Sequence, residues 1–86
     1  MDPKSTLIDI IHAQDEKERR VFVVVLAGWL RLGGFAPRVE LHPATDAWMM
    51  GDRSGSVIKA GWKYAEVRCE RSGRIRRMPW SLLQAV

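Results

Sequence analysis

Cysteine and histidine are scarce in this sequence. Its 86 residues include one cysteine, Cys69, and two histidines, His12 and His42. One cysteine cannot form an internal disulfide, and this set is too small for a structural zinc site. The histidines also lack a neighbouring nucleophile or carboxylate in an arrangement that acid–base catalysis requires. We therefore expect no metal, no cofactor and no enzyme activity, and the lack of disulfides favours a cytosolic location.

Long hydrophobic runs are absent too. The longest apolar stretch, VFVVVLAGWLRLGGFA, begins at Val21 and is interrupted by Arg31. It falls short of the roughly 20 predominantly apolar residues that cross a bilayer as a helix. The start of the chain, MDPKSTLIDI, has an acid at its second position and does not resemble a secretion signal. We expect a protein without a membrane segment.

Positive charge, by contrast, is concentrated in one half of the chain. The net charge is +4, and residues 51–86 carry eight Lys and Arg against three Asp and Glu. A chain of this length has room for one domain with one core. The uneven charge indicates an anionic partner for the second half.

The first 35 residues predict a helical segment. An apolar face made of Leu7, Ile8, Ile10 and Ile11 follows Ser5 or Thr6 as the helix cap. A second helix is predicted over residues 15–32, although four valines and a phenylalanine in that stretch also favour a strand. Its apolar residues recur at helical spacing, at Val21, Val24, Val25, Gly28, Trp29 and Leu32. Because this helix is apolar nearly all round, we expect the sheet to cover one side and a second subunit the other, in a homodimer.

The second half predicts short strands. Residues 36–45 form a connector with two prolines, which has room for a short strand at 38–41. Strands are then expected at 47–52, 55–61 and 63–70, where Ala65, Val67 and Cys69 alternate inward and Cys69 becomes a core residue rather than a reactive thiol. A hairpin ending at Gly73 leads to a fourth strand with Ile75 inward, a Pro-led helical turn and a last strand at 84–86. Five short strands of this kind indicate a small barrel.

The segment GDRSGSVIKAGWKYAEVRCERSGRIRRMPWSLLQAV resembles the small SH3-like barrels, including the KOW-type modules of ribosomal and transcription-associated proteins. The matching pieces are turn glycines and core positions in residues 46–86: Gly51-Asp52-Arg53, Gly55 and Val57, Tyr64-Ala65 and Val67, Ser72-Gly73, and Pro79 with Leu82-Leu83. The resemblance implies a five-stranded barrel, and it says little about function because its motifs are structural.

One enzyme family shares this barrel, the type II dihydrofolate reductases, which assemble four barrels around one pore. That family has a Val-Gln-Ile-Tyr stretch lining the pore, where this chain has Arg74-Ile75-Arg76-Arg77-Met78. Arginines from four subunits around one pore would repel one another. The reductase is therefore the most remote of the alternatives.

Together these patterns predict an α+β fold, in which an N-terminal helical segment (residues 1–35) and a connector (36–45) precede a five-stranded SH3-like barrel (46–86). The candidate binding residues are the cations and aromatic side chains of the barrel: Lys59, Trp62, Lys63, Tyr64, Arg68, Arg71, Arg74, Arg76 and Arg77. We expect Arg74 and Arg76 to share one exposed side of a strand and Lys59 and Lys63 to lie on neighbouring strands, with Trp62 as the best exposed aromatic contact.

Such a face suits phosphates and stacked bases, so nucleic acid is the first expected partner. An acidic protein surface is the alternative, because arginine and tryptophan are favoured anchors in protein interfaces. In that case the chain is an adaptor or inhibitor of the kind that phages and mobile elements encode, and it acts as a homodimer. Both interpretations describe a non-enzymatic binding or regulatory protein. A solvated strand face without a partner is the third interpretation of the same charges.

Overall fold

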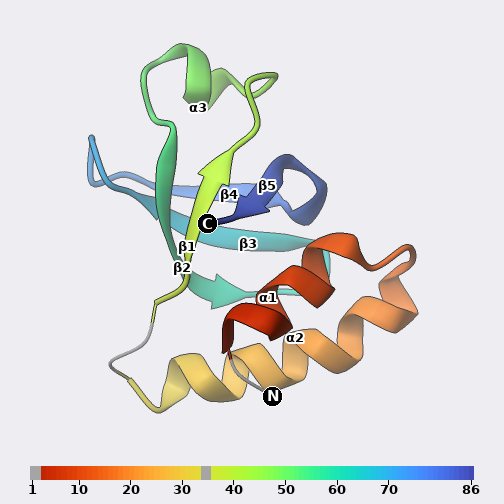
Figure 1. The fold of residues 1–86 in the computed structure, drawn as a ribbon. Helices are drawn as coiled ribbons and strands as arrows, with labels where there is room; N and C mark the ends of the chain where they lie inside the picture. The colour runs from red at the N-terminus through yellow and green to blue at the C-terminus, as the bar shows by residue number, and fades with distance from the viewer. Residues whose placement is uncertain (1–2, 34–35) are drawn as a thin grey trace.

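The computed structural model describes residues 3–33 and 36–86, which fold into two long helices, one short helix and one five-stranded antiparallel sheet (Figure 1). The expected α+β class, with an N-terminal helical region before the sheet, is therefore confirmed. The two long helices lie together along one side of the sheet, and a third, short helix lies at the opposite end of the molecule.

Helices α1 (Pro3–His12) and α2 (Glu16–Arg31) form an antiparallel pair. The helix predicted over residues 15–32 is confirmed, and the alternative of a strand in that stretch is wrong. The side chain of Asp15 caps α2 by accepting a 2.7 Å hydrogen bond from the amide of Glu18. The predicted cap of the first helix at Ser5 or Thr6 is wrong, because α1 already begins at Pro3, where a proline costs no helical hydrogen bond.

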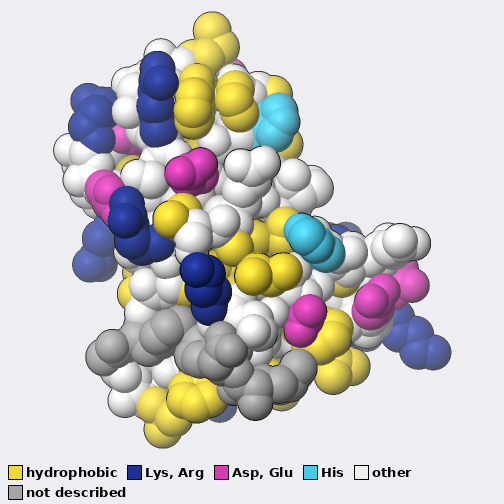
Figure 2. Space-filling view, viewed as in Figure 1, with side chains coloured by type: hydrophobic (Ala, Val, Ile, Leu, Met, Phe, Trp, Pro, Cys, Tyr) yellow, Lys and Arg dark blue, Asp and Glu magenta, His cyan; other side chains and the backbone are white. Residues whose placement is uncertain are grey.

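The buried side of α2 differs from the predicted one. Val23 and Leu26 are its buried residues, whereas Val21, Val24 and Leu32 are exposed. The apolar stripe read from the sequence therefore faces outward, and no described element covers it. Figure 2 shows hydrophobic side chains along the lower edge of the molecule, where Figure 1 places α2.

The sheet has the strand order β4-β3-β2-β1-β5, so β4 and β5 are its edges and it is not closed. Its strands are β1 (Arg38–Leu41), β2 (Ser54–Ala60), β3 (Tyr64–Cys69), β4 (Ile75–Pro79) and β5 (Leu83–Ala85), with the 3₁₀ turn η1 (Trp80–Leu82) before β5. The sequence placed β2, β3, the hairpin and the final turn correctly to within a few residues. Gly73 takes the left-handed conformation that the hairpin needs, at φ 73°.

The first strand of the sheet is β1, which lies in the connector at positions 38–41, where the sequence left room for a short strand. The strand predicted at 47–52 is wrong, because this segment holds the short helix α3 (Asp46–Met49). Thr45 caps α3 by accepting a 3.2 Å hydrogen bond from the amide of Trp48. Gly51 then turns the chain at φ 101°. A local cap and turn therefore override the apolar pattern of this stretch.

The alternation of β3 is confirmed, because Ala65, Val67 and Cys69 are buried while Tyr64 and Arg68 are exposed. Ile75, predicted to point inward, is 52% exposed. On β4 the inward positions are instead Arg76 and Met78, which stand opposite Val67 and Ala65 of β3. The error is one residue of register, and a shift of one residue moves a side chain to the other face of a strand.

One apolar core joins the helices to the sheet. Leu7 and Ile10 of α1 and Leu26 of α2 pack with buried residues of all five strands. Trp80, almost fully buried, donates a 2.9 Å hydrogen bond from Nε1 to the carbonyl of Gly61. This bond fixes the turn between β2 and β3 against η1. Within residues 3–33 and 36–86, no helix is long and apolar enough to cross a membrane.

Candidate binding face

Two exposed aromatic side chains lie close together where the turn after β2 leads into β3: Trp62 in the turn and Tyr64 at the start of β3, each 46% exposed. Single apolar side chains are common on protein surfaces, so the informative feature is that both rings line the same hollow. The hollow has a volume of about 320 Å³ and is lined by Glu16, Lys59, Gly61, Trp62, Lys63, Tyr64, Glu66 and Arg77. We call this surface, together with Arg20, the Trp62 face.

Helix α2 positions Trp62. The guanidinium carbon of Arg20 lies 4.8 Å from the centre of the Trp62 ring, within the range of a cation–π contact. The neighbouring Arg19 donates a 3.4 Å hydrogen bond from Nη1 to the carbonyl of Trp62. Both contacts hold the turn against the first turns of α2, so one side of the ring faces Arg20 while nearly half of its surface stays accessible.

Cations and acids alternate across the Trp62 face. Lys59 stands opposite Glu66 in the pairing of β2 with β3, and their charged groups lie 3.8 Å apart. Arg77 stands opposite Glu66 from the other side, on β4. At the edge of the hollow, Glu16 accepts a 3.3 Å hydrogen bond from Arg20. Four cations, counting Lys63, thus surround two acids, and the face keeps a net positive charge.

The structure places five of the nine predicted binding residues at this hollow: Lys59, Trp62, Lys63, Tyr64 and Arg77. Arg68 is exposed on the same outward side of β3 as Tyr64, but farther along the strand, between Ser56 and Ile75 of its neighbours. Arg74 is exposed in the turn before β4. The prediction that Trp62 is the exposed tryptophan is confirmed, since Trp80 is buried and Trp48 is partly covered, with Arg53 4.4 Å from its ring.

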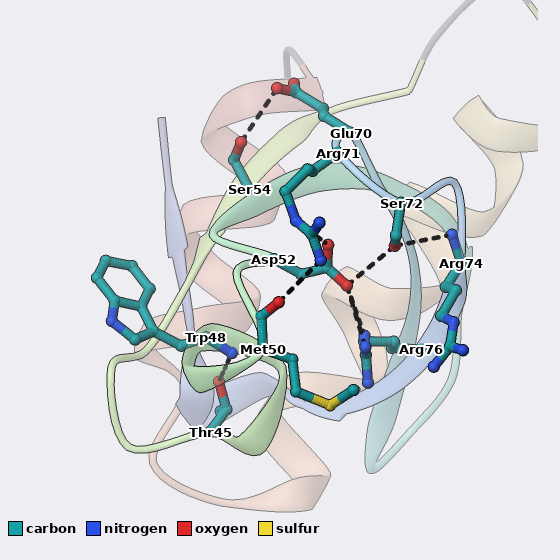
Figure 3. Close-up of polar contacts among 10 residues, drawn as sticks. All are labelled: Thr45, Trp48, Met50, Asp52, Ser54, Glu70, Arg71, Ser72, Arg74 and Arg76. Carbon is teal, nitrogen blue, oxygen red and sulfur yellow. Dashed lines mark hydrogen bonds and ion pairs between the residues drawn. The ribbon is translucent and has the colours of Figure 1, made fainter.

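Arg71 and Arg76 do not belong to this face. They bind Asp52, a fully buried carboxylate that was not predicted as an ion-pair partner (Figure 3). Nη2 of Arg76 lies 3.0 Å from Oδ2 of Asp52, and Nε of Arg71 lies 3.3 Å from Oδ1. Ser72 donates a 2.9 Å hydrogen bond to the same carboxylate. The expectation that Arg74 and Arg76 share one exposed side of a strand is therefore wrong.

The Asp52 cluster, made of Asp52, Arg71, Ser72 and Arg76, ties the loop after α3 to the hairpin between β3 and β4. Arg71 strengthens this tie by donating a 2.8 Å hydrogen bond to the carbonyl of Met50. Burial raises the pKa of Asp52, but the hydrogen bonds from Ser72 and Arg76 and the charges of both arginines outweigh it, so this pKa lies below its ordinary value. Asp52 is thus ionised, and its ion pairs with Arg71 and Arg76 stabilise the fold.

Cys69 lies next to this cluster and is buried, as predicted. Burial, together with the negative charge of Asp52, raises the pKa of its thiol. A buried thiol with a raised pKa has little thiolate at neutral pH, and the thiolate is the reactive species. Cys69 therefore has the environment of a core residue.

Sequence reasoning missed Asp52, Arg19 and Arg20 as partners of the predicted residues. The pair Arg19-Arg20 is visible in the sequence, but nothing there shows that α2 brings it to Trp62, 43 positions further along from Arg19. One feature of the sequence could have identified Asp52: it is an acid beside a turn glycine in the basic half of the chain, where an ion pair with an arginine is expected.

Within the described part of the chain, no group of three or more His, Cys, Asp or Glu residues is placed to hold a metal ion. Comparisons with protein-family models, with curated proteins and with solved structures found no match for this chain. Its function is therefore argued from the geometry of the Trp62 face.

Proposed function

We propose that this protein is a non-enzymatic binding protein whose Trp62 face contacts single-stranded nucleic acid. The observation that carries the proposal is the exposure of Trp62 and Tyr64 in a hollow bordered by four cations. Exposed aromatic rings offer flat surfaces on which unpaired bases stack, and the cations can accompany the phosphates on either side. A duplex hides the faces of its bases, which is why we propose a single strand.

The strand order and the single 3₁₀ turn between β4 and β5 support the likeness to an SH3-like barrel, which we retain as part of the proposal. We also retain the cytosolic location, supported by the single buried cysteine. The reductase-like tetramer stays an untested and remote alternative, to which the contacts of the Trp62 face add no support.

The test is a titration of a fluorescein-labelled 12-nucleotide single strand, followed by anisotropy at several salt concentrations. With four cations at the face, each phosphate contact on a single strand contributes about −0.7 to the slope of log K against log salt. The slope expected is roughly −3, so affinity falls roughly 50-fold between 50 and 200 mM salt. Trp62→Ala should weaken binding by about 1–3 kcal/mol, the value of one stacked base.

Lys63→Ala and Lys4→Ala form a matched pair for this assay. Lys63 lines the hollow and Lys4 lies on α1, so only the first substitution should reduce the salt slope, by about 0.7. Absence of binding at low salt, or equal affinity for Trp62→Ala and the unmodified protein, would refute the proposal.

A second candidate is an adaptor or inhibitor that binds an acidic protein surface through the same face. The observation that favours it is the mixture of charges in the hollow, where Glu16 and Glu66 accompany the cations, because a protein surface that is acidic overall still offers donors to these two acids, whereas a phosphate chain carries negative charge alone. Tryptophan and arginine are common anchors of protein interfaces. A partner that remains bound to immobilised protein after nuclease treatment, and is lost in Trp62→Ala, would favour this candidate.

A further inference from the structure

Strand β4 is an edge of the sheet and pairs with β3 alone. The direction of its backbone groups follows from the hairpin, where the amide of Cys69 donates a 2.8 Å hydrogen bond to the carbonyl of Arg74. Along an antiparallel pair, residues that bond to the neighbouring strand alternate with residues that do not. Arg76 and Met78 are therefore the residues of β4 whose amides and carbonyls point toward β3.

Ile75 and Arg77 alternate with them, so their amides and carbonyls point away from the sheet. None of these four groups has a backbone partner in the part of the chain that the structure describes. Pro79 ends this free edge, because it has no amide to donate. An edge with unpaired donors and acceptors is a template for one more strand, the geometry by which β-augmentation binds extended peptides.

The free edge of β4 borders a groove with a volume of about 560 Å³. One wall of the groove is β4, and the other is the start of α3, at residues 44–47 (Figure 1). Met78, Pro79 and Leu82 add apolar lining. A chain that lies along the edge is therefore contacted by side chains as well as by the backbone of β4.

The charge of this edge indicates the chemistry of its occupant. Arg77 is exposed on β4, and Arg74 is exposed just before the strand. Neither arginine forms an ion pair with another described residue. Asp46 is the single acid among the lining residues, and it belongs to the opposite wall. An acid opposite Arg77 on an added strand would form a cross-strand ion pair, which stabilises a sheet.

We propose that the free edge of β4 binds an acidic, extended peptide segment of a partner protein as an additional antiparallel strand. The peptide residue opposite Arg77 is an acid, and these two residues exchange two backbone hydrogen bonds. Two positions further along the peptide, a β-branched apolar residue pairs in the same way with Ile75. Ile75 is 52% exposed in this chain and gains an apolar neighbour on the same face.

A second copy of this chain fits the edge poorly. Two β4 strands side by side would bring Arg74, Arg76 and Arg77 of one copy against the same residues of the other, and like charges on paired strands are destabilising. A nucleic acid offers acceptors to Arg77, but it lacks the alternating amides and carbonyls that match this edge. Backbone and charge together therefore select an acidic peptide.

The Trp62 face shares Arg77 with this edge, but none of the four free backbone groups depends on Trp62. The proposal therefore stands whether or not the Trp62 face binds nucleic acid. Trp62→Ala should bind the peptide with unchanged affinity, so the two proposals can fail separately. Loss of peptide binding in Trp62→Ala would assign the peptide to the Trp62 face and overturn the present proposal.

The test is a fluorescence anisotropy titration of the full chain with a labelled peptide, Thr-Glu-Val-Val-Thr flanked by glycine and serine. Saturable binding is expected at protein concentrations up to about 1 mM. N-methylation of the glutamate removes the amide that donates to the carbonyl of Arg77, and it should abolish binding. N-methylation of the middle valine is the matched control, because its amide points away from β4, and it should leave the affinity unchanged.

Charge reversal tests the partner of Arg77. Replacing the glutamate of the peptide by lysine should weaken binding about tenfold, because an attractive cross-strand pair becomes repulsive. In Arg77→Glu, with circular dichroism to verify folding, the preference should reverse, so that the lysine peptide binds more tightly. A preference that Arg77→Glu leaves unaltered would show that the acid does not lie opposite this residue, and it would overturn the proposal.

Hydrogen exchange followed by NMR locates the added strand. The amides of Ile75 and Arg77 should become protected when the peptide is added, whereas those of Arg76 and Met78 should be protected already. Absence of saturable binding, or equal effects of the two N-methyl groups, overturns the proposal. So does protection of Ile75 and Arg77 that appears without peptide as the protein concentration rises, which would assign the edge to a second copy.

Discussion

The replacement Gly55→Ala tests the packing of the central strands. Gly55 is buried in β2 and stands opposite Val39 of β1 and Cys69 of β3. A Cβ built on it would collide with the carbonyl oxygen of Arg68 and would lie 2.7 Å from Cγ1 of Val67. The first contact is with backbone, which cannot turn aside as the end of a flexible side chain can. The alanine is therefore accommodated only if β3 moves away from β2.

The cost follows from this displacement. Overpacking of a dense interior destabilises by up to about 3 kcal/mol, and the lower entropy of the unfolded alanine chain returns about 0.4–1 kcal/mol. The net loss in the free energy of unfolding is about 2 kcal/mol, which in a domain of this size lowers Tm by roughly 8–16 °C. Thermal melts followed by circular dichroism, supported by urea titration, measure both quantities.

Gly28→Ala is the matched control, because a Cβ at Gly28 meets open space. The better helix propensity of alanine should raise stability by about 1 kcal/mol. If Gly55→Ala melted at the same temperature as the unmodified protein, the close approach of β2 to β3 would be wrong.

Two predictions concern the Asp52 cluster. Because Asp52 has a lowered pKa in the folded protein, its ionised form stabilises the fold above the pKa it has in the unfolded chain, and this contribution is lost as pH falls through the folded pKa. Asp52→Asn should therefore be less stable than the unmodified protein at pH 7, and urea titrations at pH 7 and pH 3 should show the difference shrinking in acid; a constant difference would contradict this. Cys69 should react with a thiol reagent only as fast as the protein opens, and rapid reaction in the folded state would contradict its burial.

Much of the fold could be predicted because local signals agreed with the tertiary structure. The alternation from Tyr64 to Cys69 places a strand and its buried side, and Gly73 marks the hairpin that follows. The acids at the start of α2 and its helical spacing identify the helix correctly. These signals depend on neighbours within a few residues, which a single sequence contains.

The errors have a different origin. The inward side of β4 is set by Arg76 binding Asp52, and an arginine at a half-buried, inward position contradicts any rule that places apolar residues inside. The stripe on α2 was read as its buried side because spacing reveals a face but not which way the face points. Val23 and Leu26 reach the core only because α1 and β2 lie on that side. To avoid either error, one would have to know which residues distant in the sequence lie against β4 and α2.

The candidate site was predicted only in part, because neighbouring residues are exposed together whereas the partners of each arginine come from distant parts of the sequence. Trp62, Lys63 and Tyr64 are consecutive, so any fold that exposes the turn exposes them together. Arg71 looked equivalent to Arg77 in the sequence, and only the structure separates the arginine that binds Asp52 from the one beside the hollow.

The place of β1 in the sheet has a consequence for the order in which the protein can fold. The pairs α1–α2, β2–β3 and β3–β4 each join consecutive elements, so they can form early, with short loops to close. Val39 of β1, however, pairs with Ala85 of β5. Because the chain between these strands is long until the hairpins shorten it, we expect the pairing of β1 with β5 to form after them and to complete the sheet.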